Sequence, residues 1–179
     1  MSHRLKGLLG PLLFCALATG LAAPASAQAW QCAPFARMFS GLQLFGAAAG
    51  WWSQAIGKYT QGHSPRLGSV LVFKAAGAMR SGHVATVTRI ISDRIVKVTH
   101  ANWSVIGGRR GQVERDVTVV DASPAGDWSQ VKVWYDPIHD VGQRAYPVYG
   151  FIYGGAKAVA GAVAGGTDAP KLAMDLAAL

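Results

Sequence analysis

Four polar residues have the types and the spacing of a thiol-dependent hydrolase. Cys32 comes directly before a segment with helical periodicity, His83 follows about 50 residues later, and His100 and Asn102 lie beyond it among strand-forming residues. In such an enzyme a thiolate attacks a carbonyl carbon, an imidazole takes up the thiol proton and later protonates the leaving amine, and a third group fixes the imidazole tautomer. These residue types in this order predict nucleophilic catalysis at Cys32.

The position of Cys32 relative to the expected helix favours a reactive thiol. The apolar face of this helix has members at i, i+3, i+4 and i+7, which are Phe35, Met38, Phe39 and Leu42. Pro34 fits only in a first helical turn, so Cys32 lies at or just before the helix N-terminus. Free amides and the positive end of the helix dipole stabilise a thiolate there. The alternative is that Cys32 is a buried, unreactive apolar side chain.

Two neighbouring strands are expected to carry the remaining polar residues. Residues 84–91 and 94–102 are rich in strand formers and are separated by a polar turn, which predicts a β-hairpin in which Ile91 pairs with Arg94. Further strands are expected at 69–73, 112–121, 130–136 and 146–154. A second short helix is expected within 50–62, with packing residues Trp51, Trp52, Ile56 and Tyr59.

The register of this hairpin decides which residue orients His83. Counting outward from the turn places His83 directly opposite Asn102, and His100 lies on the same face but diagonal to His83. Because directly opposed side chains are closer than diagonal ones, we expect Asn102 to accept a hydrogen bond from His83. His100 is the alternative, and it can reach His83 if the strands twist.

The first 27 residues have the pattern of an export signal. A basic start at 3–6 precedes the apolar stretch 8–23, and small residues at 25–27 fit a cleavage site. Cys15 would leave with this leader, so Cys32 would be the only cysteine of the mature chain and could form no internal disulfide. We expect a catalytic domain at 28–154, and an Ala/Gly-rich tail at 155–179 that forms a weak helix or no fixed structure.

A basic surface is expected after export. The leader holds two of the 17 Lys and Arg residues and none of the nine acidic ones, which leaves 15 against nine, or a net charge of +6 at neutral pH. Such a balance favours an anionic polymer as a neighbour. Because an exported protein seldom meets nucleic acid, the cell envelope is the expected partner, in the periplasm or outside the cell, without membrane insertion of the mature chain.

Four segments together resemble the cysteine, histidine-dependent amidohydrolase/peptidase (CHAP) domain. They are "QC" at the start of a helix, "GSVLVF", "SGHVATV" and "HANW", in this order. The resemblance implies an α+β, papain-like fold, in which an N-terminal helix carrying the cysteine packs on an antiparallel sheet. It also implies cleavage of peptidoglycan as an amidase or an endopeptidase.

The resemblance also assigns roles to single residues. It implies that Cys32 is the nucleophile, that His83 is the general base, and that Gln31 and Trp103 lie at the oxyanion and substrate-binding site. CHAP domains often have a glutamate where this chain has His100. The related NlpC-type wall peptidases often use a histidine as the third catalytic member, so the orienting role stays open between His100 and Asn102.

Other functions remain as alternatives. An acyltransferase on the same fold would use an amine or alcohol in place of water, and an inactive module would bind the wall without a reactive thiol. Zinc binding by Cys32, His83 and His100 is disfavoured because the sequence has no close pair of ligands such as CxxC or HxxxH. We therefore expect a monomer that needs neither metal nor cofactor.

Overall fold

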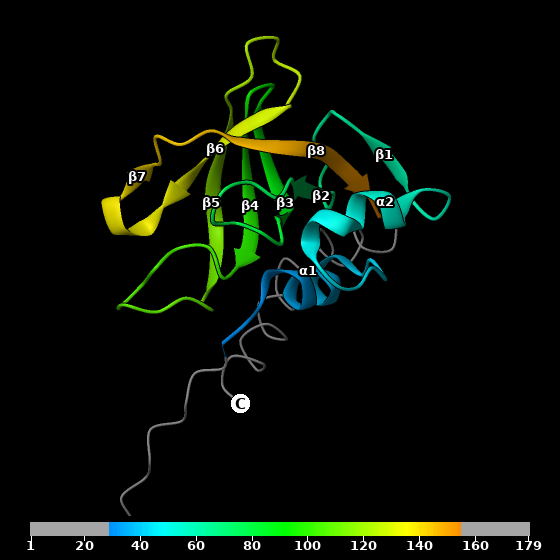
Figure 1. The fold of residues 1–179 in the computed structure, drawn as a ribbon. Helices are drawn as coiled ribbons and strands as arrows, with labels where there is room; N and C mark the ends of the chain where they lie inside the picture. The colour runs from blue at the N-terminus through cyan, green and yellow to red at the C-terminus, as the bar shows by residue number, and fades with distance from the viewer. Residues whose placement is uncertain (1–28, 155–179) are drawn as a thin grey trace, which may run out of the picture.

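An antiparallel β-sheet forms the centre of the molecule (Figure 1). The computed structural model describes residues 29–154, so the expected leader at 1–27 and the Ala/Gly-rich tail at 155–179 lie outside the described residues. The strands are β1 Thr60–Gly62, β2 Val70–Phe73, β3 His83–Ser92, β4 Ile95–Ala101, β5 Val113–Asp121, β6 Gln130–Tyr135, β7 Asp140–Val141 and β8 Tyr146–Tyr153. The helices are α1 Cys32–Ser40 and α2 Trp51–Ala55, with 3-10 turns η1 Ala48–Gly50 and η2 Asp136–Ile138.

The sheet closes on itself to form a barrel. Its strand order is β1-β8-β2-β3-β4-β5-β6-β7, and β8 pairs with β6 as well as with β2. Strands β2, β3, β4, β5, β6 and β8 therefore form a closed ring. The expected cysteine-bearing helix on an antiparallel sheet is present. The papain-like arrangement stays a prediction, because the structure consists mostly of strands and its sheet is closed into a barrel.

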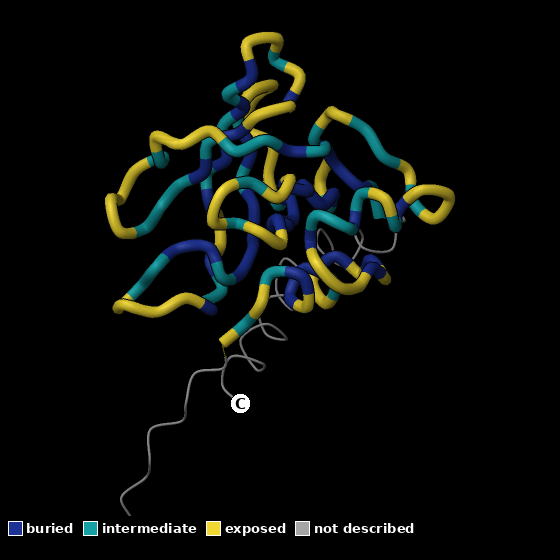
Figure 2. Tube along the Cα trace, in the orientation of Figure 1, coloured by how far each residue is buried: buried dark blue, intermediate teal, exposed yellow. Residues whose placement is uncertain are grey.

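Apolar side chains pack on both sides of the barrel wall. One cluster fills the interior and includes Leu71, Phe73, Val98 and Phe151. A second cluster lies between the outer face of β2, β3 and β8 and the two helices, and Trp51 is its largest fully buried member. Figure 2 shows buried residues along the strands and exposed residues mainly at the loops. Alternate residues of β2 and of the first half of β3 belong to the two clusters, so both faces are buried along β2 and from His83 to Val87 of β3.

Helix α1 buries only part of the face that its apolar residues predict: Phe35 and Leu42 are buried. Met38 and Phe39 are 45% and 39% exposed, whereas Ala33, Phe35, Ala36 and Ser40 are buried. The buried face has small residues because α1 lies close against the barrel wall. Helix α2 lies within 50–62 as expected, but Ile56 follows its end and is 69% exposed, so its expected packing role was wrong.

The expected hairpin of β3 and β4 is confirmed, although its turn lies one residue further along the chain than the sequence predicts. Ser92 pairs with Ile95 next to the turn, where Ile91 and Arg94 were expected. Two register shifts within the hairpin then restore the pair that counting outward predicts, Thr86 opposite Thr99. The β-bulges therefore cancel the error before the polar end of the hairpin is reached.

Among residues 29–154, no helix is long and apolar enough to cross a membrane.

Candidate active site

Cys32 is the first residue of α1, at the edge of the barrel. The preceding residue, Gln31, has extended backbone and marks the helix start, as Pro34 predicts. The thiol is half-buried, and the backbone N–H groups of Cys32, Ala33 and Val84 donate hydrogen bonds toward its sulfur. Because Val84 directly follows His83, this contact brings the sulfur to the strand start that carries the expected base.

A glycine allows the chain to enter β3 at this point. Gly82 has a φ of +68°, and a Cβ there would lie 2.6 Å from the carbonyl oxygen of Phe73 and 2.8 Å from Ala49. An L side chain is strained at such a φ and would also clash with backbone atoms. The backbone at Gly82 therefore approaches Phe73 and Ala49 closely, and this approach fixes where β3 begins.

His83 is buried inside the mouth of the barrel and is hydrogen-bonded to His100. The Nε2 atom of His83 lies 3.0 Å from Nδ1 of His100, and the two rings are nearly perpendicular. The Trp103 ring packs against His83 with 4.9 Å between centroids, and the Phe73 ring contacts both, at 5.4 Å from His83 and 5.7 Å from Trp103. These contacts hold the imidazole in one orientation.

Hydrogen bonding constrains the tautomers of this pair. The Nε2 atom of His83 is hydrogen-bonded to His100, so Nδ1 is the nitrogen of His83 that remains for proton uptake. If Nδ1 is the base, His83 is protonated on Nε2, which then donates to Nδ1 of His100, and His100 carries its own proton on Nε2. That Nε2 atom of His100 is buried and has no hydrogen-bond partner among the described residues.

Burial makes neutral side chains the resting forms of this site. Burial raises the pKa of the Cys32 thiol, and the three backbone hydrogen bonds oppose that change. Burial also holds the pKa of His83 well below its ordinary value, with smaller contributions from the charges of His100 and Arg110. Burial lowers the pKa of His100 to about 3. The stabilised thiolate expected at the helix N-terminus is therefore not the resting form, because desolvation outweighs the amides.

Asn102 contacts Gln31, where a contact with His83 was expected. Its side-chain nitrogen donates to Oε1 of Gln31 over 2.9 Å. The residue has a φ of 65°, in the left-handed region that asparagine tolerates, so the chain turns out of β4 there. Continuing the register would place Asn102 opposite His83, but the turn redirects its side chain, and the diagonal His100 makes the contact.

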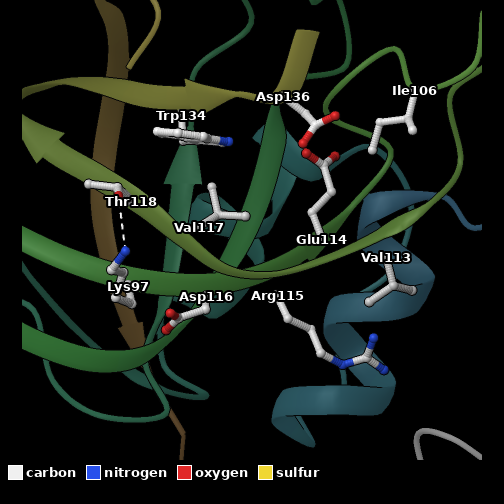
Figure 3. Close-up of a pocket in the computed structure, with 10 residues that line it drawn as sticks. All are labelled: Lys97, Ile106, Val113, Glu114, Arg115, Asp116, Val117, Thr118, Trp134 and Asp136. Carbon is white, nitrogen blue, oxygen red and sulfur yellow. Dashed lines mark hydrogen bonds between the residues drawn. The ribbon is translucent and has the colours of Figure 1, made fainter. Parts of the chain in front are cut away.

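A buried carboxylate supports the backbone behind this site. Oε1 of Glu114 accepts hydrogen bonds from the backbone N–H groups of Trp103 and Ser104, at 3.3 and 2.7 Å. Glu114 also lines a pocket beside β5, where Figure 3 shows its carboxylate and that of Asp136 pointing toward one another. Neither Cys32 nor His83 lines that pocket. At the candidate site, Glu114 holds in place the chain that follows Asn102.

Sequence reasoning missed part of the surroundings of the two histidines. Phe73 ends a strand that the pattern does predict, but its contact with His83 depends on the pairing of β2 with β3. Glu114 and Arg110 carry no signal of their own in the sequence, because charged residues in such segments are usually solvated. Strand alternation does not point to Glu114 either, because two exposed residues, Arg115 and Asp116, separate it from the next buried position, Val117.

The site contains no evident metal centre. Within the part of the chain that the structure describes, no three His, Cys, Asp or Glu side chains are grouped as metal ligands. Cys32, His83 and His100 supply ligand atoms, but the hydrogen bond between the imidazoles uses one nitrogen of each. Independence from metal stays a prediction.

Comparison with known families bears on the same residues. Residues 23–102 match the family model of the CHAP domain, and this segment contains Cys32, His83, His100 and Asn102. CHAP domains are linked to NlpC/P60-like cell-wall hydrolases. Among curated proteins, no sequence matches the chain. The resemblance drawn from the four sequence segments is confirmed: residues 23–102 of the chain match a CHAP domain.

Proposed function

We propose that this protein is an exported cysteine amidohydrolase that cleaves amide bonds of peptidoglycan. The observation that carries the proposal is the convergence of the Cys32 sulfur on the Val84 amide, next to a buried His83 whose far nitrogen is occupied by His100. This arrangement supplies a nucleophile, a base and an orienting group. The CHAP family match supports peptidoglycan as the substrate class.

The neutral resting state favours a general-base mechanism. As the sulfur attacks the carbonyl carbon, Nδ1 of His83 takes the thiol proton, and the N–H on its Nε2 donates to His100 throughout. The imidazolium then protonates the leaving amine, and the C–N bond breaks to give a thioester on Cys32. A water molecule, activated by the same imidazole, hydrolyses the thioester and restores the thiol.

Gln31 and Cys32 supply donors for the oxyanion in this proposal. The Oε1 atom of Gln31 accepts the Asn102 hydrogen bond, so its NH2 group is left as a donor at the start of α1. The backbone N–H of Cys32 already points toward the sulfur and is the second candidate. Loss of one such donor costs roughly 3 to 4 kcal/mol of transition-state stabilisation in comparable sites. Asn102 then acts as a positioning residue for Gln31.

Product analysis with matched variants tests the proposal. Purified peptidoglycan is incubated with wild type, Cys32→Ala and His83→Ala, and the released fragments are identified by mass spectrometry. The wild type should release fragments with new amino termini, whose sequence identifies an amidase or an endopeptidase, and both variants should release none. Wild-type protein that binds peptidoglycan without release would favour the inactive wall-binding module. Fragments joined to an added amine would favour an acyltransferase.

Export is tested separately. Residues 1–27 are proposed to be removed on export, so the intact mass of exported protein should correspond to a chain that begins at Gln28. A mass that retains the leader would contradict this part of the proposal.

A further inference from the structure

The loop between β4 and β5 is a rigid hairpin beside the candidate site. Ile106 and Arg109 exchange backbone hydrogen bonds of 2.9 and 3.2 Å, and the two glycines between them both have positive φ, 57° and 77°. This geometry is a two-residue hairpin turn of the kind that glycine pairs favour. The base of the loop is closed by the Asn102 N–H, which donates to the Gln112 carbonyl over 3.0 Å. The loop therefore has a defined position.

The same loop is attached to the segment that leads into α1. The Trp30 N–H donates to the carbonyl of Gly111 over 2.8 Å. Gly111 has a φ of +107°, and a Cβ there would lie 2.9 Å from Ala29, so only glycine allows this approach. Trp30 precedes Cys32 by two residues. Arg110, next to Gly111, is therefore held close to the nucleophile-bearing end of the helix.

The side chain of Arg110 extends back from the loop toward the two histidines. Its Nη1 donates to the backbone carbonyl of Trp103, whose ring packs on His83 with 4.9 Å between centroids. The charge of Arg110 also contributes to the lowered pKa of His83, which places the guanidinium within electrostatic reach of the imidazole.

The guanidinium keeps most of its donors free. The group has five N–H donors, of which the Trp103 contact uses one. Arg110 is an exposed residue, and among residues 29–154 no carboxylate lies in ion-pair contact with it. In contrast, Arg89 pairs with Asp116, and Arg94 pairs with Asp121. A cation that is held beside the candidate site and has no ionic partner among the described residues is suited to bind an anion in two-point fashion.

We propose that Arg110 binds a carboxylate of the peptide stem and makes the enzyme selective for substrates that carry a free carboxylate near the scissile amide. This inference rests on the proposed function, because it names a specificity residue for that reaction. The competing explanation is that Arg110 only clamps the loop through Trp103. The two explanations differ in whether the effect of Arg110 depends on substrate charge.

A pair of substrates that differ only in charge separates them. A soluble muropeptide that the wild type cleaves is purified, and half of it is converted to carboxamides with ammonia and carbodiimide. The value of kcat/KM is measured on both forms for wild type, Arg110→Gln, Arg110→Lys and Arg109→Gln. Arg109 is the matched control, because it is the adjacent exposed arginine and no side-chain hydrogen bond or ion pair is described for it.

The wild type should prefer the acid form by about 10- to 100-fold, the range of a charge-assisted hydrogen-bond pair. Arg110→Gln should lower kcat/KM for the acid form to the value for the amide form, and should leave kcat/KM for the amide form within about twofold of wild type. Arg110→Lys should keep part of the preference for the acid form. Arg109→Gln should keep all of that preference. Equal losses on both forms in Arg110→Gln, or the same loss of preference in Arg109→Gln, would overturn the inference.

A measurement on the wild type alone covers the case of a variant that does not fold. Added salt should lower kcat/KM for the acid form and leave kcat/KM for the amide form nearly unchanged, because salt screens the attraction between Arg110 and a carboxylate that only the acid form carries. A wild type that cleaves acid and amide forms equally well overturns the inference while the proposed function stands. A wild type that cleaves neither peptidoglycan nor muropeptide overturns the proposed function, and the inference with it.

Discussion

The buried histidine pair should make the folded protein sensitive to mild acid, and His100→Asn should remove the part of that sensitivity that comes from His100. The pKa of His100 falls from an ordinary 6.5 to about 3 on folding, and the pKa of His83 falls well below 6.5. A folded state that excludes protons which the unfolded chain binds has its full stability above pH 6.5 and loses stability as the pH falls below it.

The magnitude follows from the size of these shifts. Between pH 7 and pH 5 the unfolded chain takes up most of one proton at His100, and the folded chain takes up almost none because the pKa of His100 is about 3. At about 1.4 kcal/mol per proton and pH unit, His100 lowers the free energy of unfolding by about 2 kcal/mol over this interval, and the lowered pKa of His83 adds a loss in the same direction. In His100→Asn the loss over the same interval should therefore be smaller than in the wild type by about 2 kcal/mol.

Urea unfolding at pH 7, 6 and 5 measures this directly, with circular dichroism as the readout. His139→Asn is the control for the loss of an imidazole, because His139 is exposed and has a left-handed backbone that asparagine accepts. Equal dependence on pH in wild type and His100→Asn would refute the reasoning, since it would mean that His100 takes up a proton in the folded state as readily as in the unfolded chain.

Three further predictions concern the residues around the base. His100→Ala should lower kcat by about 10²- to 10⁴-fold and Asn102→Ala by only about 10-fold, because His100 is hydrogen-bonded to His83 whereas Asn102 is hydrogen-bonded to Gln31; steady-state kinetics on a muropeptide would contradict this ranking if Asn102→Ala were the more damaging change. Gln31→Ala and Asn102→Ala should be non-additive in a double-mutant cycle on kcat, since each breaks the same hydrogen bond, and fully additive losses would argue against a shared role. Gly82→Ala should lower the free energy of unfolding by about 2 to 4 kcal/mol from backbone strain and overpacking, and a smaller change in urea denaturation would mean that the Phe73 carbonyl moves away easily.

Local patterns in the sequence predicted the elements that carry the candidate site. Pro34 and the apolar spacing after it located the start of α1, and the strand formers on either side of a polar turn located β3 and β4. These features depend on neighbours in the chain, so the residues themselves encode them.

Features that depend on distant pairing could not be read in the same way. Closure of the barrel requires β6 to pair with β8, and neither strand carries a mark of its partner. The choice between His100 and Asn102 depended on a left-handed backbone at Asn102, which the hairpin register does not reveal. The low pKa of His83 results from burial by residues of several strands, so the charge of His83 at rest could not be predicted before the barrel was known.

The central claim is a thioester at Cys32, and trapping it tests the claim most directly. Wild type and His83→Ala are mixed with a cleavable muropeptide, quenched with acid during turnover, and digested for mass spectrometry of the peptide that contains Cys32. The proposed mechanism predicts that this peptide gains the mass of the acyl fragment in the wild type, that hydroxylamine removes the added mass, and that His83→Ala shows no adduct. Continued product release by Cys32→Ala, or turnover of the wild type with Cys32 unmodified at every quench time, would contradict it.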